Sequence, residues 1–204
     1  HYTERMYTDP GSGALIWQVY VPNGSGQTDG VSTDTSGYLY TADMNSRHIY
    51  RVRLSDKACT TFVQSGLPAL PQTMIFDASQ NRLLLASYAP QAPILAISLP
   101  DGSLSTVVVT PQGYADGITA DQFGNTYLSC YTDGKIYRYN STFTNPPFVF
   151  SSGHLTPSSI CYNQQRLELA VPMFDADSVT FVKDIYHVDS DSDGIADLST
   201  TAPW

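Results

Sequence analysis

Gly124-Asn-Thr-Tyr-Leu-Ser-Cys130 has three counterparts in the chain, and the four segments begin 44, 43 and 41 positions apart: 37–43, 81–87, 124–130 and 165–171. A second apolar and aromatic run follows each segment by about ten residues. These runs begin 45, 42 and 43 positions apart: 49–52, 94–97, 136–139 and 179–182. Two independent landmarks with one period of about 43 residues indicate an internal structural repeat.

Each repeat contains four short strand-like runs. In the third full repeat these runs are 117–120, 126–129, 135–138 and 148–150. Turn-forming residues separate them, and β-branched and aromatic residues fill them. No stretch has a sustained helical period with caps. Four short strands in every repeat predict an all-β fold, a β-propeller in which each repeat forms one blade.

The number of blades is less clear at the two ends. We expect four full blades at 29–70, 71–114, 115–156 and 157–186, and a partial blade at 1–28, although the fourth unit lacks an outer strand after Val182. Five blades are predicted, and the alternative is a fragment of a six-bladed ring. The chain begins with His1 and is expected to be a mature form or a fragment. The incomplete blades at the two ends of the chain could close on each other by strand exchange, or they could support self-assembly.

Parts of the repeat resemble known propeller families. The segment from Asp116-Gly-Ile-Thr-Ala-Asp through Ser129, with 134–139, resembles the NHL and gluconolactonase-type repeat, as does Asp29-Gly-Val-Ser-Thr-Asp34. The segment 5–11 resembles a YWTD-type strand without its Trp. The resemblance covers about four-fifths of the chain. It implies a propeller, and such propellers serve as enzymes, binding modules and scaffolds alike.

The gluconolactonase resemblance also implies a divalent cation over the central channel, held by a Glu, two Asn-type ligands and an Asp. Only Asp29 and Asp116 match this set, because the equivalent segments 71–74 and 157–160 offer neither a carboxylate nor an Asn at the matching place. We therefore interpret the two Asp-Gly pairs as turns that open an inner strand. No catalytic residue is assigned, and His154 is interpreted as an ordinary loop histidine.

An Asp-rich motif follows the last repeat, in the appendage 187–204. Acidic residues at loop positions one, three and five, followed by Gly194, match the start of an EF-hand-type calcium loop. Position twelve is Thr200 where an EF-hand has Glu, so the motif is closer to thrombospondin type 3 repeats. We expect weak calcium binding, and the predicted ligands are Asp189, Asp191, Asp193, the carbonyl of Ile195 and Asp197.

The composition excludes several classes of partner. The chain has 204 residues and a formal net charge of −9, which disfavours nucleic acid and anionic membrane surfaces. No apolar run approaches the ~20 residues of a membrane span. The acidic balance and low Lys content favour a secreted, extracellular protein, and Asn23 and Asn140 open glycosylation triplets. Of the cysteines, only Cys130 and Cys161 are expected on neighbouring blades, where a disulfide is an open possibility.

These observations predict a secreted, non-catalytic β-propeller that acts as a binding or structural module for a protein or a glycan. Tyrosines on the repeat strands are expected to pack within the blades, although a surface group of them would suit glycan stacking. One alternative is a metal-dependent lactonase-like hydrolase. A second alternative is a subunit of an extracellular filament or surface assembly, joined through the unfinished blade edges.

Overall fold

The computed structural model describes residues 4–8, 11–12, 15–19, 21, 27–67, 69–110 and 113–184. Its described part is built from β-strands, with one short 3-10 helix, η1 (Phe174–Ala176). No helix among the described residues has the length and apolar content of a membrane span.

Three sheets are four-stranded antiparallel meanders in which each strand pairs with the next along the chain. The first contains β3 (Thr28–Thr33), β4 (Tyr38–Asp43), β5 (His48–Arg53) and β6 (Cys59–Val63). The second contains β7 (Leu70–Asp77), β8 (Arg82–Tyr88), β9 (Pro93–Ser98) and β10 (Leu104–Val109). The third contains β11 (Ala115–Ala120), β12 (Thr126–Cys130), β13 (Lys135–Tyr139) and β14 (Phe148–Ser152).

Two smaller sheets flank these three. A three-stranded sheet contains β15 (Cys161–Asn163), β16 (Glu168–Met173) and β17 (Ser178–Lys183), and a hairpin pairs β1 (Glu4–Thr8) with β2 (Leu15–Val19). Among the described residues, β17 pairs with β16 alone. The last sheet thus has three described strands and the first unit has two.

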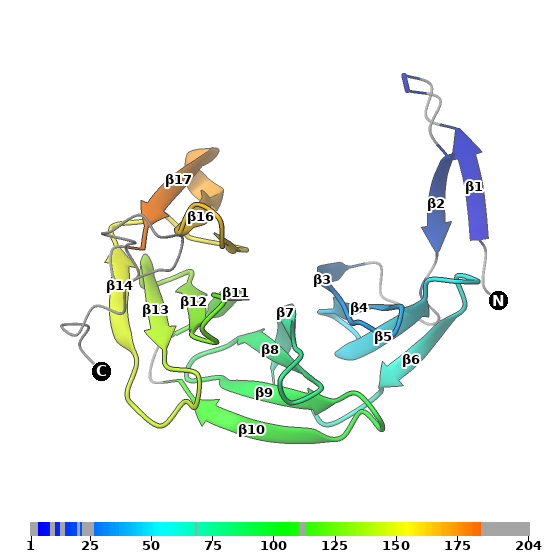
Figure 1. Ribbon diagram of the computed structural model, residues 1–204, viewed down its shortest axis with the longest axis horizontal. Coiled ribbons are helices and arrows are strands. Elements are labelled where there is room, and N and C mark those ends of the chain that lie inside the picture. The colour runs from blue at the N-terminus through cyan, green and yellow to red at the C-terminus, as the bar shows by residue number, and fades with distance from the viewer. Residues whose placement is uncertain are drawn as a thin grey trace.

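The sheets are arranged as the blades of a β-propeller, as predicted. Figure 1 shows them side by side along an arc, with β3, β7 and β11 innermost. The four repeat segments lie in β4, β8, β12 and β16, the second strand of every blade. The second landmark lies in β5, β9, β13 and β17, the third strand of every blade.

Apolar packing between neighbouring blades forms the core. One buried cluster joins the first and second blades through Tyr40, Ile49, Leu83 and Leu95. Equivalent clusters join the second blade to the third and the third to the fourth. The second and third blades therefore bury both sheet faces against their neighbours, which explains why their strands contain so few charged residues.

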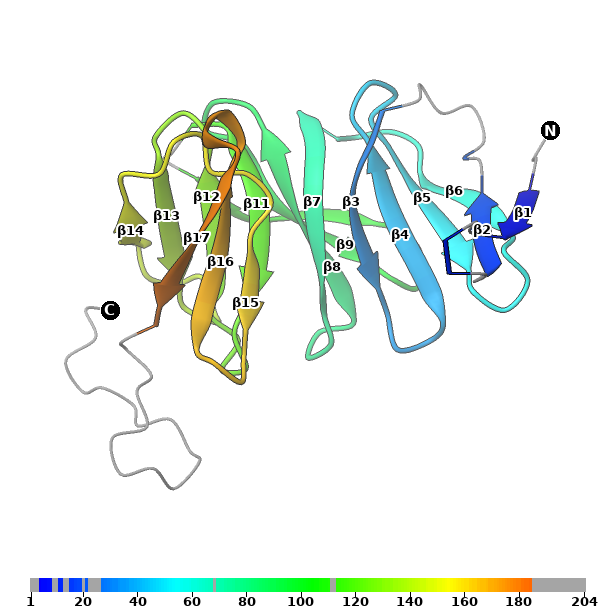
Figure 2. The ribbon, with the colours of Figure 1, turned by 90° about the horizontal axis from the view of Figure 1, so that it is seen from above.

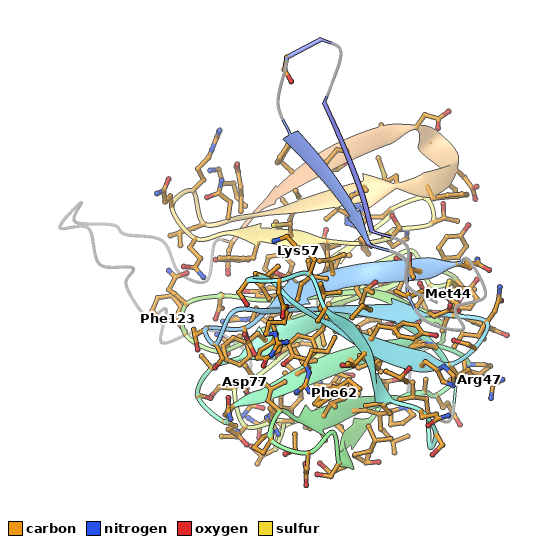
Figure 3. All side chains as sticks on the ribbon, turned by 90° about the vertical axis from the view of Figure 1, so that its right-hand side faces the viewer. Met44, Arg47, Lys57, Phe62, Asp77 and Phe123 are labelled. Carbon is orange, nitrogen blue, oxygen red and sulfur yellow. The ribbon has the colours of Figure 1, made fainter. Side chains whose placement is uncertain are left out.

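The strand order gives the propeller two distinct faces. One face, which we call the upper face, lies at the top of Figure 2. At this face the inner strands β3, β7 and β11 begin, and the second strands β4, β8, β12 and β16 end. The lower face is opposite. Figure 3 shows Met44 and Arg47 of the upper face on one side of the molecule and Asp77 and Phe123 of the lower face on the other.

Each complete blade has a register shift near the upper end of its inner strand, between Asp29 and Val31, Pro71 and Met74, and Ala115 and Ile118. Such bulges re-aim side chains locally. At Gly117 an added Cβ would lie 2.5 Å from the Ser158 carbonyl oxygen. The Gly of this Asp-Gly pair is therefore needed for close approach between blades.

The three cysteines are free: Cys59 and Cys130 are buried, and Cys161 is exposed. Burial raises the pKa of the Cys130 thiol to about 12.

Candidate functional site on the upper face

One repeat position on the upper face carries a large, soft side chain in every blade. It is the residue directly after β4, the last residue of β8, and the residue directly after β12 and β16. The four residues are Met44, Tyr88, Tyr131 and Phe174, and successive members lie 44, 43 and 43 positions apart in the sequence. Phe174 is the most exposed of them, at 68%.

Three of these residues and Tyr114, which precedes β11, form what we call the aromatic row. The Tyr88 ring lies 4.8 Å from the Tyr114 ring and 5.8 Å from the Tyr131 ring, between centroids. The Tyr131 ring is 6.3 Å from Phe174. The row therefore runs across three neighbouring blades, and the three tyrosines are only half-buried.

Asp116 lies beside the row, in the bulge of β11. Burial and the nearby Asp29 carboxylate raise the pKa of Asp116 to about 6. Burial raises the pKa of Tyr88 too, and the next contributions come from Tyr131 and Asp116. The two predicted aspartates are thus close enough to interact, although they lie on different blades.

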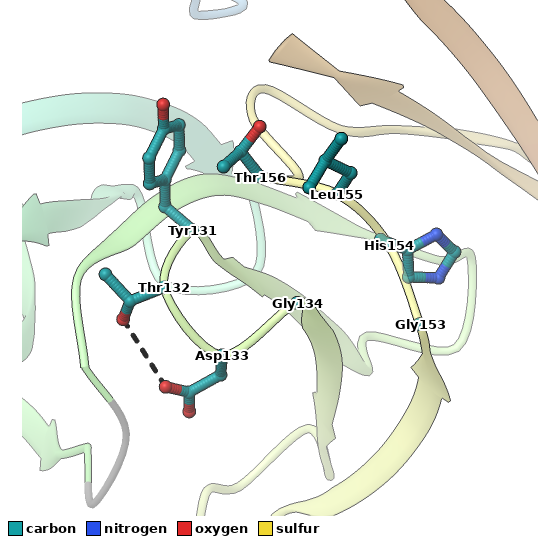
Figure 4. Close-up of a pocket in the computed structure, with 8 residues that line it drawn as sticks. All are labelled: Tyr131, Thr132, Asp133, Gly134, Gly153, His154, Leu155 and Thr156. Carbon is teal, nitrogen blue, oxygen red and sulfur yellow. Dashed lines mark hydrogen bonds between the residues drawn. The ribbon is translucent and has the colours of Figure 1, made fainter. Parts of the chain in front are cut away.

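A pocket of about 520 Å³ opens beside Tyr131 of the row. Figure 4 shows Tyr131, Thr132 and Asp133 on one side of it and Leu155 and Thr156 on the other. The Asp133 carboxylate accepts hydrogen bonds from Thr132 Oγ1 at 3.4 Å and from the Tyr137 hydroxyl at 3.2 Å. The pocket thus offers an acidic group, hydroxyls and apolar surface.

His154 contributes backbone rather than its ring to this pocket. Its ring points away from Asp133 in Figure 4, and its Nε2 is hydrogen-bonded to Ser151 Oγ at 2.8 Å. Burial lowers the pKa of His154. The ring is therefore held by the Ser151 hydroxyl of the preceding strand, β14.

Ion pairs are distributed unevenly between the two faces. Five ion pairs lie at the lower face, namely Arg53–Asp56, Arg82–Asp77, Arg138–Asp121, Arg166–Glu168 and Lys183–Glu168. Five upper-face carboxylates form no ion pair with any described residue: Asp29, Asp116, Asp133, Asp175 and Asp177. The negative charge of the upper face is therefore not neutralised within the described part of the chain.

The donor set in the channel does not fit the divalent-metal site that the gluconolactonase resemblance implies. The equivalent inner-strand positions hold Asp29, Gln72, Asp116 and Ser158. The Gln72 amide donates to the Met44 sulfur at 3.7 Å, which directs it toward the first blade. In the described part of the chain, no three His, Cys, Asp or Glu residues group as metal ligands. The calcium ligands predicted at 189–197 lie outside the described residues.

The tyrosines that the sequence assigned to blade packing lie as expected. Tyr40, Tyr50, Tyr127, Tyr137 and Tyr139 are buried, and Tyr38 is half-buried. The aromatic row is not evident from a comparison of the strands alone, because its residues lie where the strands end or begin. The spacing of Met44, Tyr88, Tyr131 and Phe174 was the available signal.

Comparison with known proteins supports the fold. Neither protein-family models nor curated proteins match this sequence. Among solved structures, a chain of a nidogen/laminin complex is similar with a TM-score of 0.62 and 14% identity, over 88% of this chain and 85% of that one. A gluconolactonase from Xanthomonas campestris is similar with a TM-score of 0.66 and 14% identity, over 80% and 59%. Virginiamycin B lyase from Staphylococcus aureus is similar with a TM-score of 0.62 and 15% identity, over 85% and 60%.

These similarities show the fold: the chain is a β-propeller. The chain spans about 60% of the length of the lyase and the gluconolactonase. Enzymes and binding proteins both occur among these neighbours, so the fold alone does not choose between them.

Proposed function

We propose that this chain is a non-catalytic β-propeller binding module that holds its partner on the upper face. The observation that carries this proposal is the repeat position of Met44, Tyr88, Tyr131 and Phe174, which places soft apolar side chains on the same face in four blades. Aromatic residues at a surface provide large contact area at low entropic cost, and they are enriched where partners bind.

Two further features support this proposal. The pocket beside Tyr131 gives the face a concave anchor point. The solved structures similar to this chain include a chain of a nidogen/laminin complex and an auxiliary nutrient binding protein from Bacteroides thetaiotaomicron, which are both named for binding. In agreement with the sequence analysis, we further propose that the module is secreted and that its partner is a protein or a glycan.

The test is a screen of the full chain against peptide and glycan arrays, repeated with a Tyr131→Ala, Phe174→Ser double variant. The matched control is Phe123→Ser, which removes an aromatic residue that is 37% exposed on the lower face. A ligand that binds wild type and the control but not the double variant would support the proposal. Ligands that bind all three proteins equally would contradict it.

A hydrolase of the lactonase type is the second candidate, and Asp116 favours it. A carboxyl group with a pKa of about 6 beside a half-buried tyrosine has the properties of a general base near neutral pH. The measurement is hydrolysis of aldonolactones in a pH-stat by wild type and by Asp116→Asn. Turnover that disappears in the variant would favour the enzyme, whereas no turnover above the spontaneous rate would count against it.

Self-assembly is a separate proposal, based on the edge of the fourth blade. Val179 and Phe181 of β17 are 51% and 64% exposed, and β17 pairs with β16 alone among the described residues. An apolar edge strand is a template for pairing with another chain. Sedimentation equilibrium should then show concentration-dependent association that Phe181→Lys weakens. A monomer over the whole concentration range would overturn this proposal.

A further inference from the structure

We infer that the upper face binds a basic protein segment, with an Arg or Lys side chain of that segment seated beside Asp116 and the Tyr88 ring. This inference rests on the proposed binding function and specifies the chemistry of the partner. One observation supports the positive charge of the partner, a second supports its contact with the aromatic row, and a third supports a second anchor in the pocket.

The charge of the upper face indicates a basic partner. Asp29 is near enough to Asp116 to raise its pKa, and Asp133 lines the pocket beside Tyr131. Asp175 and Asp177 flank the exposed Phe174. Arg47 and Lys135 are the only Arg or Lys residues among the described upper-face turns and strand ends, and neither pairs with these carboxylates. A face with uncompensated negative charge attracts and orients a positively charged partner.

The aromatic row provides the second contribution. This chain stacks its own guanidinium groups on aromatic rings: Arg51 lies 4.9 Å from the Tyr38 centroid and 4.7 Å from that of Phe62. On the upper face the rings are present, but no described Arg or Lys stacks on Tyr88, Tyr114, Tyr131 or Phe174. A cation from a partner can take that place, next to the Asp116 carboxylate.

The pocket supplies a second anchor for the same segment. Tyr131 belongs both to the aromatic row and to the pocket wall, so the two sites are continuous. Asp133 and the Thr132 hydroxyl offer hydrogen-bond acceptors to a second basic side chain, and Leu155, which is 53% exposed, covers its aliphatic stem. A segment with two basic residues would therefore fit this face better than a single cation.

The test is an NMR titration of the full chain with acetyl-(Gly-Arg)₃-amide, using acetyl-(Gly-citrulline)₃-amide as the neutral control of the same shape. We expect the arginine peptide to shift the signals of Tyr88, Tyr131 and Phe174 and to bind at least about fivefold more tightly than the citrulline peptide. Tyr88→Leu and Asp116→Asn should each weaken binding about two- to fivefold. The lower-face controls Phe123→Leu and Asp101→Asn should bind as wild type does.

The peptide pair keeps the test decisive even where a variant does not fold, because it uses the wild-type chain. Equal binding of both peptides on the upper face would overturn the cationic partner while leaving the proposed binding face intact. A neutral oligosaccharide that shifts the aromatic row when neither peptide does would identify the partner as a glycan instead. Shifts confined to the lower face, or no shifts with any of these probes, would contradict both the inference and its assignment to the upper face.

Discussion

The repeated aspartates of the lower face and Asp116 of the upper face serve opposite purposes. On the lower face, one repeat position carries Asp34, Asp77, Asp121 and Asn163, and each side-chain oxygen accepts hydrogen bonds from backbone N–H groups of the following turn. These residues close the turn between the first and second strands of their blades. On the upper face, Asp116 lies in a bulge, has no ion-pair partner among the described residues, and has a raised pKa.

This difference separates stability from function. A carboxylate that caps a turn or pairs with an arginine stabilises the fold, whereas a half-buried carboxylate beside another carboxylate destabilises it. Proteins retain such locally unfavourable arrangements mainly at sites where a function requires them. The turn-closing aspartates and the buried ion pair of the lower face should therefore stabilise the fold, whereas loss of the Asp116 charge should increase stability.

The largest effect is expected for Arg138→Met on the lower face. Arg138 is fully buried, and its Nη2 lies 3.8 Å from Asp121 Oδ2. The nearby Asp184 carboxylate is buried too and accepts hydrogen bonds from the hydroxyls of Tyr127 and Tyr162 at 2.6 and 3.0 Å. Removing the cation leaves buried negative charge without compensation, so the free energy of unfolding should fall by about 3–5 kcal/mol.

Urea denaturation of Arg138→Met measures this effect, and Arg53→Met is the matched control. Arg53 pairs with Asp56 at the same face, but both side chains are about half exposed. Exposed pairs contribute little, so the control should change stability only slightly. Similar losses in the two variants would show that the buried ionic cluster is not what holds the third and fourth blades together.

The next largest effect is expected for Gly117→Ala at the upper end of β11. The added Cβ would meet the Ser158 carbonyl oxygen at 2.5 Å and the Ile160 amide nitrogen at 2.6 Å, both in the backbone of the fourth blade. Because backbone cannot move aside cheaply, unfolding free energy should fall by about 2–3 kcal/mol.

Gly37→Ala provides the comparison, since nothing lies within 4 Å of its added Cβ although its φ is +87°. At Gly37 only the strain of the positive φ opposes the alanine, so the free energy of unfolding should fall by about 1 kcal/mol. Thermal unfolding of both variants tests the ranking. A larger loss for Gly37→Ala would show that the inner strands are not in close contact at the Asp-Gly bulge.

A third, smaller effect on stability is expected for Asp116→Asn, which should raise the free energy of unfolding rather than lower it. Burial and Asp29 raise the pKa of Asp116 to about 6, so the folded protein binds this proton more tightly than the unfolded chain. Stability linked to Asp116 is therefore present below about pH 4 and is lost as pH rises through about 6. Asp116→Asn removes the ionisation and should raise the unfolding free energy by about 1–2 kcal/mol at pH 7.5 but little at pH 4.

Asp77→Asn on the lower face is the matched control for this prediction. Burial raises the pKa of Asp77, but hydrogen bonds from Ser79 and Arg82 outweigh it and lower the pKa overall. Its stabilising contribution is present above about pH 4 and is lost as pH falls, so Asp77→Asn should destabilise the protein at pH 7.5. Stability curves against pH for both variants would contradict the contrast between faces if the two substitutions acted in the same direction.

The sequence was sufficient for the fold because the repeat has two landmarks on adjacent strands of every blade. The segments around Tyr40 and Tyr127 predicted the second strands, and β17 lacks a described outer strand where the sequence pattern ends at Val182. The candidate site was only partly predictable. Asp29 and Asp116 stand out in the sequence by their Asp-Gly motif, but they were interpreted as turn residues, because their mutual influence depends on how the blades curve around the channel.

Two other features required tertiary structure. Asp184 accepts a hydrogen bond from Tyr127, 57 residues away, and nothing in the local pattern predicts that pairing. The aromatic row was missed for a different reason: Tyr88, Tyr131 and Phe174 lie at strand ends, where the expectation was turn chemistry rather than binding. Their common period becomes meaningful once the blades are superposed.

The smallest effect on stability is expected from calcium, and it tests whether the upper-face carboxylates are themselves an ion site. We predict that calcium binds the Asp-rich motif that contains Asp189, Asp191, Asp193, Ile195 and Asp197, with an affinity at the weak end of roughly 10⁻⁴ to 10⁻³ M. Calorimetric titration should give weaker binding for Asp193→Ala and unchanged binding for Asp116→Asn. Because apolar packing between blades holds the propeller, a chelator should leave its melting temperature nearly constant. Loss of calcium binding in Asp116→Asn instead would mean that a cation, and not a basic partner, neutralises the upper face.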